Sequence, residues 1–202
     1  MSFSKQERIQ LTRLLLDVGP DAPTCCEGWN TRDLAVHLFV REHRPLAAAG
    51  MFFPPLASRL EAVSNEVAQW EFSDFVNRWG SGPPRGIKPV DQLMNRAENF
   101  VHHEDVRRAT NYTPRQFDVA TQRELYSALK MAKSMLKGST QRVVLNPSGE
   151  VAFPQLFAGN RRAAETVEVS GPVAELLLWV FGRPAKDVEF TGDPAALRLI
   201  QL

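Results

Sequence analysis

Three residues have the types and spacing of a metal site: His37, Glu98 and His102. Glu98 and His102 are four residues apart, so on a helix their side chains lie one above the other on one face. A carboxylate and an imidazole are ligands for a borderline divalent ion such as zinc, and a stable site needs a third protein ligand. His37, on a predicted earlier helix, is the candidate for it. The competing interpretation is that these side chains merely satisfy one another inside a helical bundle.

The candidate ligands lie at the edges of predicted apolar faces. On the later helix, at about 100° per residue, Glu98, His102 and Asp105 follow one border of the apolar face. His37 lies about 60° from Leu34 on its own helix, at the border of the face that Leu34 begins. Neighbouring helices of a bundle can bring such borders together. The apolar residues of the later helix are Leu93, Met94, Ala97 and Val101.

The remaining histidines and the two cysteines are expected to be structural. His43 and His103 point away from the candidate ligands and are predicted to lie at the surface. Cys25 and Cys26 are neighbours in sequence, which rarely bridge, so we expect two reduced thiols that pack as small apolar side chains. Alternatively, the loop that carries them could bring one thiol near the ion, because it leads into the helix of His37.

Length and composition indicate an ordinary globular protein. The 202 residues are 44% hydrophobic and 23% charged, and the net charge is +1. A balanced charge gives no general attraction for nucleic acid or for membrane surfaces. We find no apolar run of about 18 residues and no signal-peptide pattern at the start. Together with the reduced cysteines, these features predict a cytoplasmic protein.

Helix-start signals and apolar spacing predict a helical bundle over residues 1–138. Ser4 with Glu7, Asn30 with Asp33, and Thr121 with Glu124 have the spacing of capping boxes. A fourth helix is expected from Pro89 to about residue 109. The other predicted helices run over 4–18, 31–49, 56–79 with a break near 70–73, and 121–137.

After Gly138 the pattern changes to short strands and helices. Strands over 142–145 and 150–153 flank Asn146-Pro147-Ser148-Gly149, which is typical of a hairpin turn. Two further strands are predicted over 166–169 and 188–191, and two helices over 172–181 and from Pro194 onward. Residues 139–202 are therefore predicted to form a small α+β domain that packs on the bundle.

The order of these motifs carries a family resemblance. Trp29-x-x-x-Asp33-Leu34-x-x-His37, then Glu98-x-x-x-His102-x-x-Asp105, then Ser170-Gly171-Pro172 and the apolar run 176–182 resemble the mycothiol-dependent maleylpyruvate isomerase family. That family belongs to the DinB-like metal-binding four-helix-bundle superfamily. The resemblance covers nearly the whole chain. It implies a mainly α fold, with a DinB-like metal-binding bundle over 1–138 and a small α+β C-terminal domain over 139–202.

The resemblance also implies a metal centre and a thiol. In such proteins a divalent ion, often zinc, is held by residues matching His37, Glu98 and His102. The bound ion would activate the thiolate of a cosubstrate such as mycothiol. The thiolate would then be transferred to a small electrophilic substrate or would promote its isomerisation. Arg41 is a candidate for binding an anionic group, and Asp105 for orienting a ligand. The chain is shorter than the isomerase, and the substrate-binding residues of that enzyme are not matched in it. Maleylpyruvate is therefore not assigned as the substrate.

Two other function classes remain open at this stage. The chain could be a metal-binding module without catalysis, or a metal-dependent hydrolase with hydroxide at the open position. Dependence on thiol separates the three function classes. A transferase turns over substrate only with thiol, a hydrolase turns it over without thiol, and a binding module shows no turnover in either case. The sequence does not identify the oligomeric state.

Overall fold

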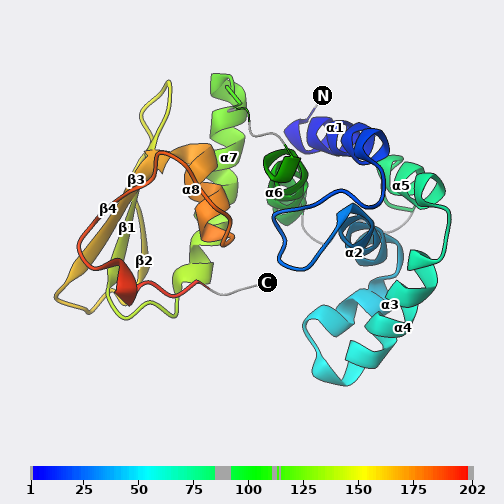
Figure 1. Ribbon diagram of the computed structural model, residues 1–202. Helices are drawn as coiled ribbons and strands as arrows, with labels where there is room; N and C mark the ends of the chain where they lie inside the picture. The colour runs from blue at the N-terminus through cyan, green and yellow to red at the C-terminus, as the bar shows by residue number, and fades with distance from the viewer. Residues whose placement is uncertain (1, 85–91, 111–112, 114, 200–202) are drawn as a thin grey trace. The chain divides into compact units, whose positions relative to one another are not determined.

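A computed structural model of the chain describes residues 2–84, 92–110, 113 and 115–199 (Figure 1). In the helix that starts at residue 92, side chains are described from 97 to 109. Contacts divide the chain into two units, Met1–Asn95 with His102–Thr113, and Arg96–Val101 with Pro114–Leu202. The mainly α fold with a small sheet is confirmed. The domain boundary at residue 138 stays a prediction.

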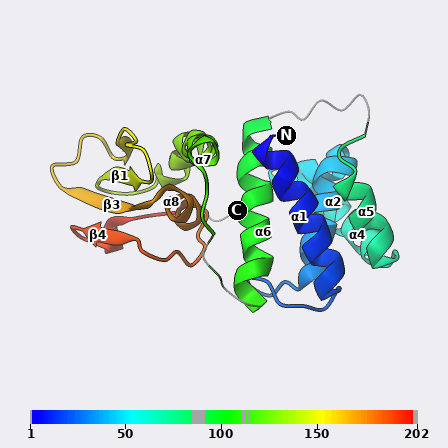
Figure 2. The ribbon, with the colours of Figure 1, turned by 90° about the horizontal axis from the view of Figure 1, so that it is seen from above.

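The first unit is helical and contains the helices before residue 95 and both ends of the next helix, whose residues 96–101 are counted with the second unit. Figure 1 and Figure 2 show α1, α2, α5 and α6 side by side in it. Its helices are α1 (Phe3–Val18), α2 (Thr31–His43), α3 (Pro45–Ala48), α4 (Ala57–Ala68), α5 (Phe72–Gly80) and α6 (Gln92–Thr110). Two 3-10 turns, η1 (Ala49–Met51) and η2 (Pro54–Leu56), lie between α3 and α4. The predicted break near residues 70–73 is confirmed as the gap between α4 and α5.

Two of the three predicted capping boxes are wrong. Only Asn30 caps its helix as expected: its side chain accepts from the Asp33 N–H, and Asp33 accepts from the Asn30 N–H. Ser4 lies inside α1, whose N-cap is Ser2, and the Glu7 carboxylate meets His103 instead. In both wrong cases the motif begins inside the first turn of the helix, two or three residues after the true N-cap.

The N-cap of α7 is not the predicted Thr121 but Asp118, which accepts from the Thr121 N–H. Helix α2 also ends earlier than predicted, at His43, because Arg44 leaves helical dihedrals before Pro45 starts α3. The helix predicted from Pro89 is found from Gln92, and Pro89 lies outside the described residues.

The core of the helical unit is apolar and aromatic. It includes the fully buried side chains of Leu11, Leu15, Leu34, Phe39, Phe75, Trp79 and Val106. One buried ion pair crosses it: the Arg8 guanidinium donates to both oxygens of Glu42, at 2.7 and 2.6 Å. The same guanidinium lies 4.6 Å from the centre of the Trp79 ring and donates to the Trp79 carbonyl. The charge of Arg8 is thus shared among several groups.

The second unit contains a four-stranded mixed sheet and two longer helices. Its strands are β1 (Arg142–Ser148), β2 (Leu156–Gly159), β3 (Thr166–Pro172) and β4 (Glu189–Thr191), in the order β2-β1-β3-β4. Strand β1 pairs antiparallel with β2 and parallel with β3, and β3 pairs antiparallel with β4. The helices are α7 (Val119–Ala132), continued by η3 (Lys133–Leu136), and α8 (Val173–Val180).

Helix α8 is apolar on nearly all sides because it is covered on nearly all sides. It packs on β1 and β3 and contacts α7 on its other side (Figure 1). Leu176, Leu177 and Leu178 are all fully buried. Among the described residues no helix combines the length and the apolar character that crossing a membrane requires.

Two predictions about this unit are wrong. The partner of β1 is Leu156–Gly159 and not 150–153. Strand β1 continues through the predicted turn, because Asn146 pairs with Ser170 of β3 and donates from its side chain to Glu168 and Ser170. The helix predicted from Pro194 is a single 3-10 turn, η4 (Pro194–Ala196).

Candidate metal centre

Helix α2 positions His37 through its start and its apolar face. The reciprocal cap between Asn30 and Asp33 fixes the first turn, two turns before His37. Leu34 and Leu38 are buried, as predicted, and anchor the helix in the core. His37 is half-buried at the border of that face. Its ring is therefore held by the helix yet still reachable by a ligand.

Helix α6 carries Glu98 and His102 one turn apart. Ala97 and Val101 are buried, which confirms half of the predicted apolar face, while the side chains of Leu93 and Met94 lie outside the described part. Glu98 is half-buried and His102 is 7% exposed. The carboxylate and the imidazole thus lie along one edge of the buried face.

The structure brings the three predicted ligands together. One ligand atom each from His37, Glu98 and His102 lie within 4.8 Å of one another. The rings of His37 and His102 meet edge to face, with centroids 5.3 Å apart. Two imidazoles and one carboxylate suit a borderline divalent ion, and three protein ligands leave a position open for another molecule. The donor set therefore fits the metal that the resemblance implies.

Asp105 contacts the Nδ1 side of the His102 ring. Its Oδ2 lies 3.0 Å from Nδ1 of His102, and the carboxylate is 1% exposed. A carboxylate can only accept, so Nδ1 carries the proton and Nε2 keeps its lone pair when the ring is neutral. This is the arrangement by which a carboxylate orients a metal-binding histidine.

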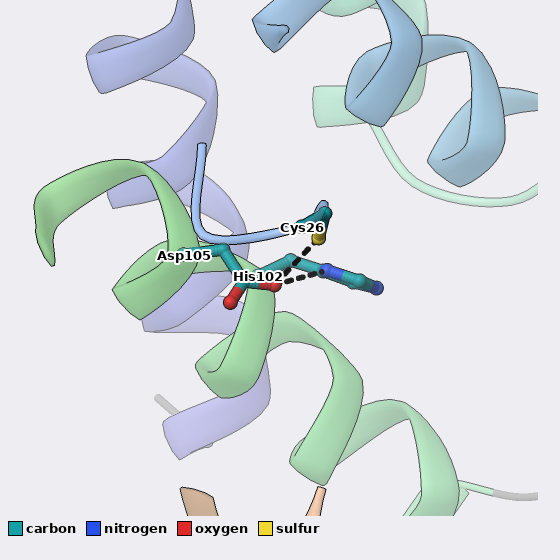
Figure 3. Close-up of side chains that lie close together, drawn as sticks. All are labelled: Cys26, His102 and Asp105. Atoms are coloured by element: carbon teal, nitrogen blue, oxygen red, sulfur yellow. Dashed lines mark hydrogen bonds and ion pairs between the residues drawn. The ribbon is translucent and has the colours of Figure 1, made fainter. Parts of the chain in front are cut away.

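Cys26 reaches the same carboxylate oxygen. Its thiol donates to Oδ2 of Asp105 at 3.1 Å, and Figure 3 shows both interactions converging on one oxygen. Cys26, His102 and Asp105 form a second group whose potential ligand atoms lie within 4.8 Å of one another. Cys26 is therefore not simply an apolar packing residue, and the alternative that its loop brings a thiol to the site describes the structure better.

Two further predicted positions are wrong. His43 is 8% exposed and stacks on Phe39, with ring centroids 4.5 Å apart. His103 is 5% exposed, and its Nδ1 lies 2.8 Å from a Glu7 oxygen of α1. Both are buried: His103 meets a partner distant in sequence, whereas His43 stacks on a ring one turn earlier on its own helix. Neither belongs to a ligand group in the described structure.

Arg41 and Trp29 flank His37. Arg41 follows it by one helical turn on α2 and is half-buried. The Trp29 ring lies 5.3 Å from the His37 ring, tilted by 50°, and remains 37% exposed. From sequence, Trp29 is expected to staple the start of the helix onto Leu34. Its contact with His37 could have been anticipated only from the shape of the preceding loop.

Comparison with known proteins shows a likeness in fold. Crystal structures of the mycothiol-dependent maleylpyruvate isomerase and of a histidine-to-alanine mutant of it each match 95% of this chain and 91% of their own, with a TM-score of 0.61. Sequence identity is 13% to the former and 11% to the latter. No family model and no curated protein matches the sequence. The chain thus shares the fold of mycothiol-dependent maleylpyruvate isomerase.

Proposed function

We propose that the chain binds a divalent metal ion, most simply zinc, through His37, Glu98 and His102, and that it catalyses a thiol-dependent transfer or isomerisation. The observation that carries the proposal is the convergence of these three side chains, from two helices, within 4.8 Å. The likeness in fold to a mycothiol-dependent isomerase supports it and suggests that the chain belongs to that family. It also suggests mycothiol, or a related small thiol, as the cosubstrate.

The chain's own residues would prepare the site for that chemistry. When bound, a divalent ion favours thiolate over thiol and so supplies a nucleophile near neutral pH. Asp105 fixes the proton of His102 on Nδ1, which leaves the Nε2 lone pair for the ion. Arg41, one turn from His37, is placed to bind a carboxylate of the thiol or of the electrophile. Use of a small cellular thiol agrees with the predicted cytoplasmic location.

Metal content tests the ligand set. Replacing His37, Glu98 or His102 by alanine should lower bound zinc strongly, since two remaining protein ligands hold an ion much less well. His43→Phe is the matched control on α2, because it replaces another buried histidine that stacks on an aromatic ring. Zinc is measured per folded chain by elemental analysis. Full occupancy in all three alanine variants would overturn the proposed ligand set.

Thiol binding tests the proposed activity. Metal-loaded protein should bind mycothiol more tightly than apo protein in calorimetric titrations, and Arg41→Met should weaken binding without lowering zinc content. Equal binding to both forms would contradict a thiol-activating centre. Turnover of an ester or amide substrate without thiol would instead identify a metal-dependent hydrolase.

A further inference from the structure

We propose that Cys26, His102 and Asp105 form a second cation site that takes thiophilic divalent ions. The site shares His102 with the proposed zinc ligands, so an ion in one site excludes an ion from the other. The site itself stands on the contacts of these three residues, and only the exclusion rests on the proposed function. All three residues belong to the helical unit.

The three potential ligand atoms already lie within 4.8 Å of one another. Sγ of Cys26 and Nδ1 of His102 lie 3.1 and 3.0 Å from Oδ2 of Asp105, and Figure 3 shows the thiol and the ring approaching that oxygen from different directions. His102 and Asp105 are three residues apart on α6, so the helix sets their separation. The cysteine comes from the loop before α2.

The loop holds the thiol in place through its backbone. The Cys25 N–H donates to the Asp105 carbonyl at 3.0 Å, which ties the loop to α6 at the residue that the thiol meets. The Thr24 hydroxyl accepts from the Cys26 N–H at 3.1 Å. The Trp29 N–H closes a turn onto the Cys26 carbonyl, and Gly28 supplies the φ of +75° that this turn needs. The ligand atom is thus positioned before any ion arrives.

Donor type and exposure decide which ions fit. A thiolate among the ligands favours soft ions such as Cd²⁺ over ions that prefer oxygen. Asp105 and His102 are buried, whereas Cys26 is half-buried, so an ion can enter from the side of the thiol. On binding, the thiol proton leaves to solvent and the His102 proton moves from Nδ1 to Nε2. Asp105 changes from an acceptor of two hydrogen bonds into a ligand.

The tautomer of His102 accounts for the exclusion. The proposed zinc site needs the Nε2 lone pair, with the proton on Nδ1. The second site needs the Nδ1 lone pair, with the proton on Nε2. A neutral imidazole has one proton and one free lone pair, so it serves one site at a time. Ion type therefore selects which ligand set is used.

Titration with Cd²⁺ tests the site directly, because thiolate-to-cadmium charge transfer gives an ultraviolet absorption band that nitrogen and oxygen ligands do not. The parent protein should develop this band and saturate at one ion per chain. Cys26→Ser should abolish it, and the serine hydroxyl can still donate to Asp105, which preserves the fold. Cys25→Ser is the matched control and should keep the band. A band that persists in Cys26→Ser, or that disappears only in Cys25→Ser, would overturn the proposal.

Further variants separate this site from the proposed function. Asp105→Asn should weaken Cd²⁺ binding by about tenfold or more. His37→Ala should keep the cadmium band even though it loses zinc, so failure of either site is seen independently. Cd²⁺ added to zinc-loaded parent should release zinc to a chromogenic chelator, and should release less from Cys26→Ser. Simultaneous retention of both ions by the parent would overturn the exclusion.

Discussion

The two units bury polar groups in different ways. Among the described residues, the helical unit buries the ionisable side chains of Glu7, Arg8, His43, His102, His103, Glu104 and Asp105. Beyond residue 114 the buried polar side chains are Gln122, Ser139 and Glu175. Burying an ionisable group costs free energy unless a partner offsets it. The helical unit buries several such groups, and the candidate ligands His37 and His102 lie in this unit.

Within the helical unit most of these groups meet an opposite partner. Arg8 pairs with Glu42, and His103 meets Glu7. Glu104 accepts from two arginines of its own helix, Arg107 and Arg108, at 2.7 and 2.9 Å. The pairs that join two helices, Arg8 with Glu42 and His103 with Glu7, fix which way each helix faces, because rotating a helix would separate the partners. In the α+β unit, apolar packing around α8 fixes the orientation of that helix.

The largest effect is expected at the contact between α1 and α6. His103→Leu leaves a buried carboxylate without its imidazole partner and should lower the free energy of unfolding by about 4 kcal/mol. The double variant with Glu7→Leu replaces the pair by two apolar side chains and should lose much less. Urea unfolding of the parent, the two single variants His103→Leu and Glu7→Leu, and the double variant gives the coupling energy. Additive losses would show that the two side chains do not act as a pair.

A comparable loss in the α+β unit should come from apolar packing alone. Leu177→Ala removes a fully buried side chain of α8 and should cost about 3 kcal/mol through lost burial and a cavity. Trp179 reports on this unit and Trp79 on the helical unit, so single-tryptophan backgrounds can follow each transition. We expect the loss in the transition seen by Trp179. An equal shift in the transition seen by Trp79 would show that the units unfold together.

Helical periodicity explains what could be predicted from sequence. Glu98 and His102 are four residues apart, so any helix places them together, and His37 follows a readable cap and an apolar face. The position of Cys26 could not be predicted, because it depends on a loop tied to α6 through Asp105, 79 residues later. His103 was misplaced for the same reason: its partner Glu7 is 96 residues away. The spacing of residues predicts which side chains share one face of a helix. It does not predict which distant segment of the chain packs on that face.

A smaller effect is expected at the helix start that carries the proposed ligand. Asn30→Ala removes the side-chain acceptor for the Asp33 N–H and should cost about 1 kcal/mol in the transition of the helical unit. Asn30→Ser keeps an acceptor and should stay near the parent. Urea unfolding followed at Trp79 provides the measurement. Equal stability of the alanine and serine variants would mean that the cap does not hold α2.

The smallest effect concerns the pH dependence of stability and tests the cost of one buried histidine. Burial lowers the pKa of His43 from its ordinary value of 6.5; Glu42 opposes this shift, and Arg78 adds to it. Nδ1 of His43 has no hydrogen-bond partner among the described residues, so the folded structure offers little to a protonated ring. Below pH 6.5 the unfolded chain therefore takes up this proton more readily than the folded chain.

His43 thus contributes its full stability above pH 6.5, and the contribution falls as the pH drops from there toward the lower pKa of the folded state. His43→Phe keeps an aromatic ring against Phe39 but cannot be protonated, so it should lose less stability than the parent between about pH 7.5 and about pH 5.5. The other histidines are present in both proteins, and their contributions cancel in the difference. Unfolding free energies at the two pH values give the comparison. An equal or larger loss in His43→Phe would mean that burial at this position does not disfavour the charged ring.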